Sequence, residues 1–135
     1  IRNEEVGNMA SSTSVYPVVR EKLVELQRQL AKSAEVIMDG RDIGTCVLPD
    51  AQVKIYLTAS SATRAKRRFD ELTEKGVSCD LAEIEKDIID RDYRDMHRET
   101  SPLCQAKDAV LVDSSEMNID EVVDAIYQFY LKAEK

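Results

Sequence analysis

Three absences narrow the classes to which this sequence of 135 residues can belong. The three cysteines are odd in number and lack metal-site spacing, which argues against a disulfide framework and favours a reducing compartment. No apolar run is long enough to span a membrane, and no signal peptide opens the chain. We therefore expect a cytoplasmic protein with no membrane partner.

Positively charged residues are outnumbered: 19 Lys and Arg stand against 26 Asp and Glu, which gives a formal net charge of −7. This balance argues against binding of a nucleic-acid polymer through its phosphate backbone. Arginines nevertheless gather within residues 64–98, and a basic cluster inside an acidic protein suits a small anionic ligand. Salt-bridged helix faces are the alternative explanation for part of this cluster. The arginines are Arg64, Arg67, Arg68, Arg91, Arg94 and Arg98.

The remaining composition is that of one globular domain, with 43% hydrophobic and 33% charged residues. Apolar spacing predicts helices followed by strands in alternation, which indicates an α/β fold with parallel strands and crossover helices. Three strands are few for a complete parallel sheet, and the chain opens without methionine in an apparent helix, so we expect a fragment. The predicted helices cover residues 4–14, 17–32, 62–75, 81–100 and 119–131, and the predicted strands 35–38, 53–57 and 109–113.

The predicted strand at 35–38 leads directly into the turn Asp39-Gly40-Arg41-Asp42-Ile43-Gly44-Thr45. Open α/β sheets build their sites beyond the carboxyl ends of such strands. Arg41 offers a planar fork for a phosphate or carboxylate, and Asp42 can accept hydrogen bonds from a polar ligand. The alternative is an ordinary Asp-Gly turn with an exposed ion pair.

A second charged group lies on the predicted helix that begins at Leu81. Arg91, Arg94, Asp95 and Arg98 are spaced by three, four and seven residues, which places them on one helical face. Three cations and one acid there could clamp a phosphorylated ligand that bears hydroxyl groups. The alternative is an ion-paired surface helix, and so charged a segment is not expected to pack on a core.

Taken together, these motifs resemble cytidylate kinase, a family of P-loop nucleoside monophosphate kinases. The resemblance covers essentially the whole chain, in the same order and spacing. It implies part of a three-layer P-loop fold, divided into a helical remainder of the monophosphate-binding region (1–33), core strands and helix (34–76), a helical lid (77–102) and a core strand and helix (103–135). The residues that carry it are Pro17-Val18-Val19-Arg20, Gln27-Arg28, Asp39-Gly40-Arg41-Asp42-Ile43-Gly44-Thr45, Pro49-Asp50-Ala51, Lys54-Ile55-Tyr56-Leu57-Thr58-Ala59-Ser60, Arg91-Asp92-Tyr93-Arg94-Asp95-Met96-His97-Arg98 and Ser101-Pro102-Leu103.

The resemblance implies a monomeric enzyme that transfers the γ-phosphoryl group of ATP to CMP or dCMP, with Mg²⁺. It assigns the cytosine to Arg20, Asp42 and Arg98 and the ribose to Ser11, Arg91 and Asp95. It assigns the CMP phosphate to Arg41, and catalytic roles to Arg41, Arg91 and Asp95. Candidates for contact with ATP are Arg64, Arg67 and Arg68. No residue of this chain is assigned to a metal.

One departure from the family is clear, because the chain contains no Gly-x-x-x-x-Gly-Lys-Ser/Thr motif. That loop supplies the backbone cradle, the phosphate lysine and the hydroxyl on Mg²⁺ in P-loop kinases. We therefore expect a C-terminal portion that holds most of the CMP site and is inactive by itself. The alternatives are a kinase with another specificity, such as UMP, a non-catalytic nucleotide-binding module, and an interaction domain.

Overall fold

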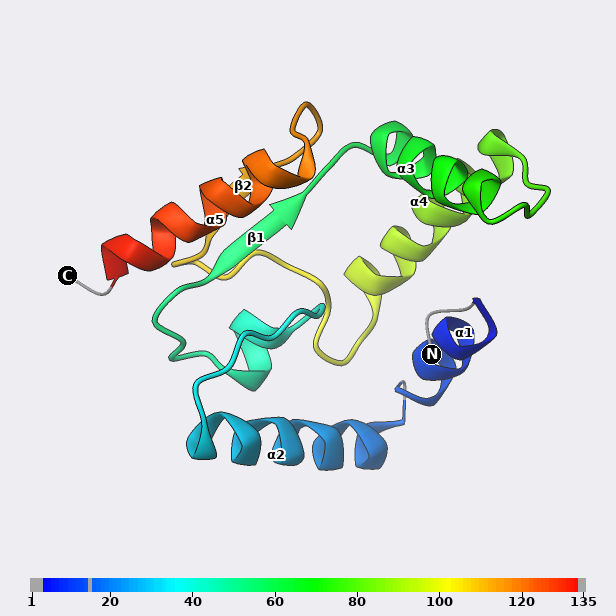
Figure 1. Cartoon of the computed structure of the whole chain (residues 1–135). Helices are drawn as coiled ribbons and strands as arrows, with labels where there is room; N and C mark the ends of the chain where they lie inside the picture. Colours follow the sequence, from blue (N-terminus) through cyan, green and yellow to red (C-terminus); the bar gives the residue numbers. More distant parts are fainter. Residues whose placement is uncertain (1–3, 15, 134–135) are drawn as a thin grey trace.

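The computed structural model describes residues 4–14 and 16–133, apart from a few side chains in the first helix. Helices dominate, and the described helices include none that is long and apolar enough to cross a membrane. The elements (Figure 1) are α1 (Glu4–Thr13), α2 (Pro17–Ser33), the π-helical turn η1 (Ile43–Val47), β1 (Ile55–Thr58), α3 (Ser61–Glu74), α4 (Leu81–His97), β2 (Val110–Asp113) and α5 (Ile119–Ala133).

Strands β1 and β2 pair in parallel, from Ile55 opposite Val110 to Thr58 opposite Asp113. Because parallel neighbours need a crossover, the chain leaves β1, runs through α3 and α4, and returns as β2. Helix α5 follows β2 and, in the view of Figure 1, overlaps the strand pair. The predicted strands at 53–57 and 109–113 and the α/β class are confirmed. Buried apolar side chains among the described residues are few: Val47, Ala59, Ala65 and Val112.

The helix boundaries follow local chemistry. The Ser60 hydroxyl accepts from Thr63 N at 3.1 Å and caps α3. Gly76, with φ +72°, follows the end of α3 in the left-handed conformation that glycine adopts most easily. The Asp80 carboxylate accepts from Glu83 N at 2.9 Å and caps α4. These contacts confirm the helices predicted at 62–75 and from Leu81.

The strand predicted at 35–38 is wrong. These residues form no strand, and Ile37 is fully exposed. A parallel strand requires a neighbour that supplies hydrogen bonds, and among the described residues β1 and β2 pair only with each other. The apolar run has the composition of a buried strand, but the part of the chain that the structure describes offers it no partner.

The charged end of α4 was not expected to pack on a core, and residues 91–98 bury no apolar side chain, although the segment does contact α3. Helices α3 and α4 lie side by side (Figure 1), and Arg64 of α3 forms an ion pair with Asp92 of α4. Asp95 is only 8% exposed. The helix ends at His97, and Arg98 has extended backbone geometry, so Arg98 does not share the helical face of Arg91 and Asp95. Ion pairs rather than apolar contacts hold this segment.

Candidate functional site

Five charged side chains from three separate segments meet near η1, and we call them the arginine–aspartate cluster. Arg20 Nη1 of α2 lies 2.5 Å from Asp42 Oδ2. Arg98 Nη2, just beyond α4, lies 3.9 Å from Asp42 Oδ1. Arg41 Nε lies 2.8 Å from Asp95 Oδ2 of α4. Three arginines and two aspartates leave the cluster with one net positive charge, although the whole chain is acidic.

The turn before η1 places Asp42 in this cluster. Gly40 allows a close approach there, because a Cβ atom at this position would lie 2.8 Å from Ile43 Cγ1. Asp42 is the N-cap of η1, and its carbonyl oxygen accepts from Cys46 N and Val47 N at 2.8 and 3.1 Å. Single π-helical turns are rare and occur often at functional sites. The backbone of Asp42 is therefore held by η1 while its carboxylate faces two guanidinium groups.

Arg98 is the least satisfied member of the cluster. Its Nε donates to Ser101 O at 2.7 Å, but its buried Nη2 has no hydrogen-bond partner among the described residues. The 3.9 Å separation from Asp42 is too long for a hydrogen bond. Burial, followed by the nearby charge of Arg20, lowers the pKa of Arg98, while Asp42 acts in the opposite direction. A buried donor without an acceptor is costly, and an incoming ligand could satisfy it.

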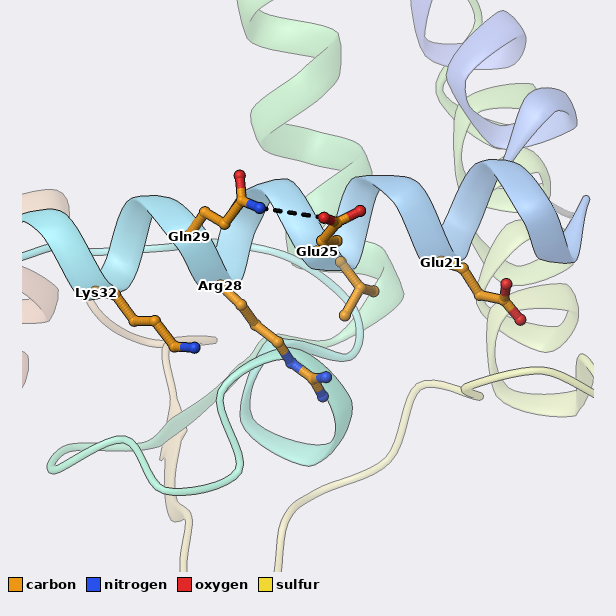
Figure 2. Close-up of a pocket in the computed structure, with 6 residues that line it drawn as sticks. Glu21, Glu25, Arg28, Gln29 and Lys32 are labelled. Atoms are coloured by element: carbon orange, nitrogen blue, oxygen red, sulfur yellow. Dashed lines mark hydrogen bonds between the residues drawn. The ribbon is translucent and has the colours of Figure 1, made fainter.

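A concavity of about 250 Å³ lies beside Arg20 and Asp42. Small-molecule sites usually enclose roughly 300–1,000 Å³, so this one suits part of a nucleotide rather than all of it. A second concavity of about 410 Å³ lies along α2 and contains no member of the cluster (Figure 2). The first is lined by Ser14, Arg20, Leu23, Val24, Leu26, Gln27 and Asp42, and the second by Glu21, Val24, Glu25, Arg28, Gln29 and Lys32.

None of the other predicted site residues that the structure describes forms a hydrogen bond or ion pair with the arginine–aspartate cluster. Arg91 is exposed and makes no hydrogen bond or ion pair with the described residues. Arg64 pairs with Asp92, which raises the pKa of Arg64. Arg67 donates to Ser114 O and Met117 O, and Arg68 pairs with Glu71. Ser11 belongs to α1, but its side chain lies outside the described part of the structure.

The residues present do not fit a Mg²⁺ ion. Within residues 4–14 and 16–133, no group of three or more His, Cys, Asp or Glu side chains could hold a metal. The two carboxylates of the cluster, Asp42 and Asp95, are each bound by arginine.

Two residues near the cluster were not assigned a role from the sequence. Arg28 of α2 donates from Nε to Val47 O at 2.9 Å and from Nη2 to Cys46 O at 2.6 Å. Ser101 has φ 51°, which is unusual for a residue other than glycine. Its carbonyl accepts from Arg98, and its hydroxyl lies 3.5 Å from Cys46 Sγ. Arg28 did belong to the quoted Gln27-Arg28 motif, but its spacing alone gave no sign of this contact.

The fold and the cluster define a parallel α/β protein with a partly buried arginine–aspartate site of net positive charge. Comparison with known proteins is specific: the cytidylate kinase family model matches residues 1–132. The chain is 54% identical over 135 residues to the cytidylate kinases of Lactobacillus gasseri and Lactobacillus johnsonii, and spans 59% of their length. It is 53% identical over 126 residues to cytidylate kinase of Streptococcus pneumoniae, and matches 56% of that protein. The chain belongs to the cytidylate kinase family.

Proposed function

We propose that the protein carrying this chain transfers the γ-phosphoryl group of ATP to CMP or dCMP, and that the arginine–aspartate cluster recognises the monophosphate. The observation that carries this proposal is the meeting of Arg20, Arg41, Asp42, Asp95 and Arg98 through three ion pairs. The similar proteins from Lactobacillus and Streptococcus are cytidylate kinases, which supports the same activity. The family resemblance assigns all five residues to CMP.

Asp42 and the two arginines beside it, Arg20 and Arg98, match the polar edge of cytosine. The Asp42 carboxylate can accept from the exocyclic amine, while Arg20 and Arg98 can donate to the ring nitrogen and carbonyl oxygen. The unpartnered Nη2 of Arg98 supplies a donor that is not already committed. Uracil would present a carbonyl oxygen to Asp42 in place of the amine, and two acceptors facing each other would disfavour UMP.

The Arg41–Asp95 pair suits the other end of the nucleotide. Arg41 keeps 41% of its side chain exposed, so a phosphate can reach its guanidinium and form charge-assisted bonds. Asp95, 2.8 Å away, can accept from ribose hydroxyls. Arg91 precedes Asp95 by one helical turn and can reach the same sugar. Phosphate and ribose are adjacent in a nucleotide, and Arg41 and Asp95 are adjacent in the protein. Catalysis by such a site rests on positioning and charge neutralisation.

The ATP side of the reaction is supported mainly by family membership. Arg64, Arg67 and Arg68 remain candidates for ATP, and each would have to exchange a present protein partner for a phosphate. The segment 77–102, proposed as a lid, carries Arg91, Asp95 and Arg98. Its closure over both nucleotides would exclude water and limit ATP hydrolysis.

The test uses the complete natural protein. We expect calorimetry to show CMP or dCMP binding at least about tenfold tighter than UMP, and a coupled assay to show CMP-dependent ADP release. Tighter binding and faster turnover of UMP would indicate a UMP kinase. Binding of CMP without turnover would indicate a nucleotide-binding module. Failure to bind either nucleotide would favour an interaction domain.

A further inference from the structure

Arg28 lies two turns beyond Arg20 on α2, and both side chains reach the short turn η1. Arg20 meets the carboxylate of Asp42 at the N-cap of η1. Arg28 meets the opposite end, where it donates to the carbonyl oxygens of Cys46 and Val47. Figure 2 shows the Arg28 side chain leaving α2 toward this turn, and Lys32, one turn further along, is exposed. Helix α2 therefore holds η1 by both ends.

The carbonyl groups at the end of η1 need such a donor. A helix leaves its last carbonyls without intrahelical partners, and η1 has only one turn. Val47 is 2% exposed, so water has little access to replace a lost partner there. The guanidinium is charged and offers two donors in a fixed plane, which makes these bonds stronger than neutral ones.

The position of η1 controls two members of the cluster. Its N-cap residue is Asp42, whose carbonyl accepts from Cys46 N and Val47 N. At the other end, Cys46 Sγ lies 3.5 Å from the Ser101 hydroxyl, and the Ser101 carbonyl accepts from Arg98 Nε. A shift of η1 would therefore move Asp42 directly and Arg98 through Ser101. Arg41 directly precedes Asp42 in the chain, but its guanidinium is bound separately, by Asp95.

We propose that Arg28 is a positioning residue: by binding the Cys46 and Val47 carbonyls it fixes η1, and through η1 it sets Asp42 and Arg98 to recognise the nucleobase. The proposal rests on the proposed function, because it assigns a base-reading role to that same site. Arg28 itself does not touch the nucleotide. Its loss should weaken base recognition and leave the contacts with phosphate and ATP largely intact.

The test compares Arg28→Met, Arg28→Lys and the matched control Lys32→Met in the complete natural protein. Lys32 lines the same concavity one turn further along α2 and makes no hydrogen bond or ion pair with the described residues. We expect Arg28→Met to raise the KM for CMP roughly tenfold and to reduce the preference for CMP over UMP by a similar factor. The KM for ATP should stay within about twofold, and Arg28→Lys, which keeps one charged donor, should recover part of the loss.

Three results would overturn the proposal that Arg28 is a positioning residue. Equal losses for CMP and UMP, or equal losses for CMP and ATP, would overturn the proposal, since Arg28 would then not act on base recognition. A lower unfolding midpoint with an unchanged CMP preference would also overturn it and leave Arg28 a purely structural contact. If Arg28→Met does not fold, Arg28→Lys decides by the same CMP-to-UMP ratio. The wild-type protein in these assays reports separately on the proposed function, which fails if wild type does not phosphorylate CMP or if it prefers UMP.

Discussion

At the scale of single residues, each aspartate of the cluster is held by arginine. Asp42 and Asp95 are each 8% exposed, and a carboxylate so far from water is tolerated because its charge is compensated. The arginines differ: Arg41 is 41% exposed, whereas Arg20 and Arg98 are 13% and 20% exposed. Substitutions of Arg41 should therefore report on ligand binding, and substitutions of Arg20 on both binding and stability.

Arg41→Ala should remove a charge-assisted phosphate contact. We expect a loss of roughly 1.5–3 kcal/mol in binding or transition-state free energy for CMP, measured as kcat/KM in the complete natural protein. The unfolding free energy should fall as well, because the substitution leaves the buried carboxylate of Asp95 without its arginine, and it must be measured alongside. Normal kinetics together with a strongly destabilised fold would show that Arg41 serves only as the partner of Asp95.

Asp95→Ala and Arg20→Ala should separate recognition of the sugar from recognition of the base. An ionised carboxylate accepts from ribose hydroxyls and alanine does not, so Asp95→Ala should lower kcat/KM for CMP by about one to two orders of magnitude. A dideoxyribose cytidine monophosphate lacks those hydroxyls, so its kcat/KM should fall less. Arg20→Ala should weaken both substrates alike.

The unfolding free energy of both variants must be measured alongside, because Arg20→Ala removes the hydrogen-bonded partner of the buried Asp42 and Asp95→Ala leaves the partly exposed Arg41 without its ion-pair partner. An equal effect of Asp95→Ala on the ribose and dideoxyribose substrates would mean that Asp95 orders the segment 77–102 instead of reading the sugar.

At the scale of elements, α3 and α4 form the best-connected helix pair of the described chain. Ion pairs and caps define this pair more than apolar burial does, since Ala65 is the one fully buried apolar side chain that these two helices contribute among the described residues. The Arg64–Asp92 pair and the Ser61–Glu85 hydrogen bond of 2.9 Å join the two helices. The start of α4 depends on the cap at Asp80.

Asp80→Ala removes the acceptor for Glu83 N and should lower the unfolding free energy by about 1 kcal/mol. Asp87→Ala is the matched control, because Asp87 is exposed in the middle of α4 and makes no hydrogen bond or ion pair with the described residues. The control should change the unfolding free energy by no more than about 0.5 kcal/mol. Urea denaturation measures both, and equal losses would contradict a capping role for Asp80.

Helices were the most predictable elements, because their signals are local. The ranges predicted at 17–32 and 62–75 lie within one residue of α2 and α3 at both ends, and both helices are confirmed. The strand at 35–38 could not be judged from its own residues, since a strand exists only beside a partner. The turn η1 had no apolar periodicity to reveal it.

The candidate site shows the same division between local and distant information. Spacing placed Arg91 and Asp95 on one helical face, and both lie in α4. The pairs Arg20–Asp42 and Arg41–Asp95 span 22 and 54 positions, and no local pattern encodes such contacts. Only the family resemblance grouped these residues in advance. Arg28 acts on backbone carbonyls, which have no side-chain identity for a sequence pattern to match.

At the scale of the whole molecule, this chain holds the arginine–aspartate cluster but no Gly-x-x-x-x-Gly-Lys-Ser/Thr motif. We expect the chain of 135 residues by itself to show no measurable CMP-dependent ADP release, because nothing in it cradles the ATP phosphates. A coupled assay tests this directly. Turnover near the usual kinase range of about 1–100 per second would mean that other residues of this chain bind ATP productively.

The outer edges of the two-stranded sheet affect the solubility of this chain. Among the described residues β1 and β2 have only each other as neighbours, so each keeps one open edge, and the apolar residue Ile37 is fully exposed. Open edges are templates for pairing between molecules. The charge of −7 keeps copies apart, but salt screens that repulsion over about 10 Å at 0.1 M. The solubility of this chain should therefore fall as salt is added, and light scattering should show the fall growing with protein concentration.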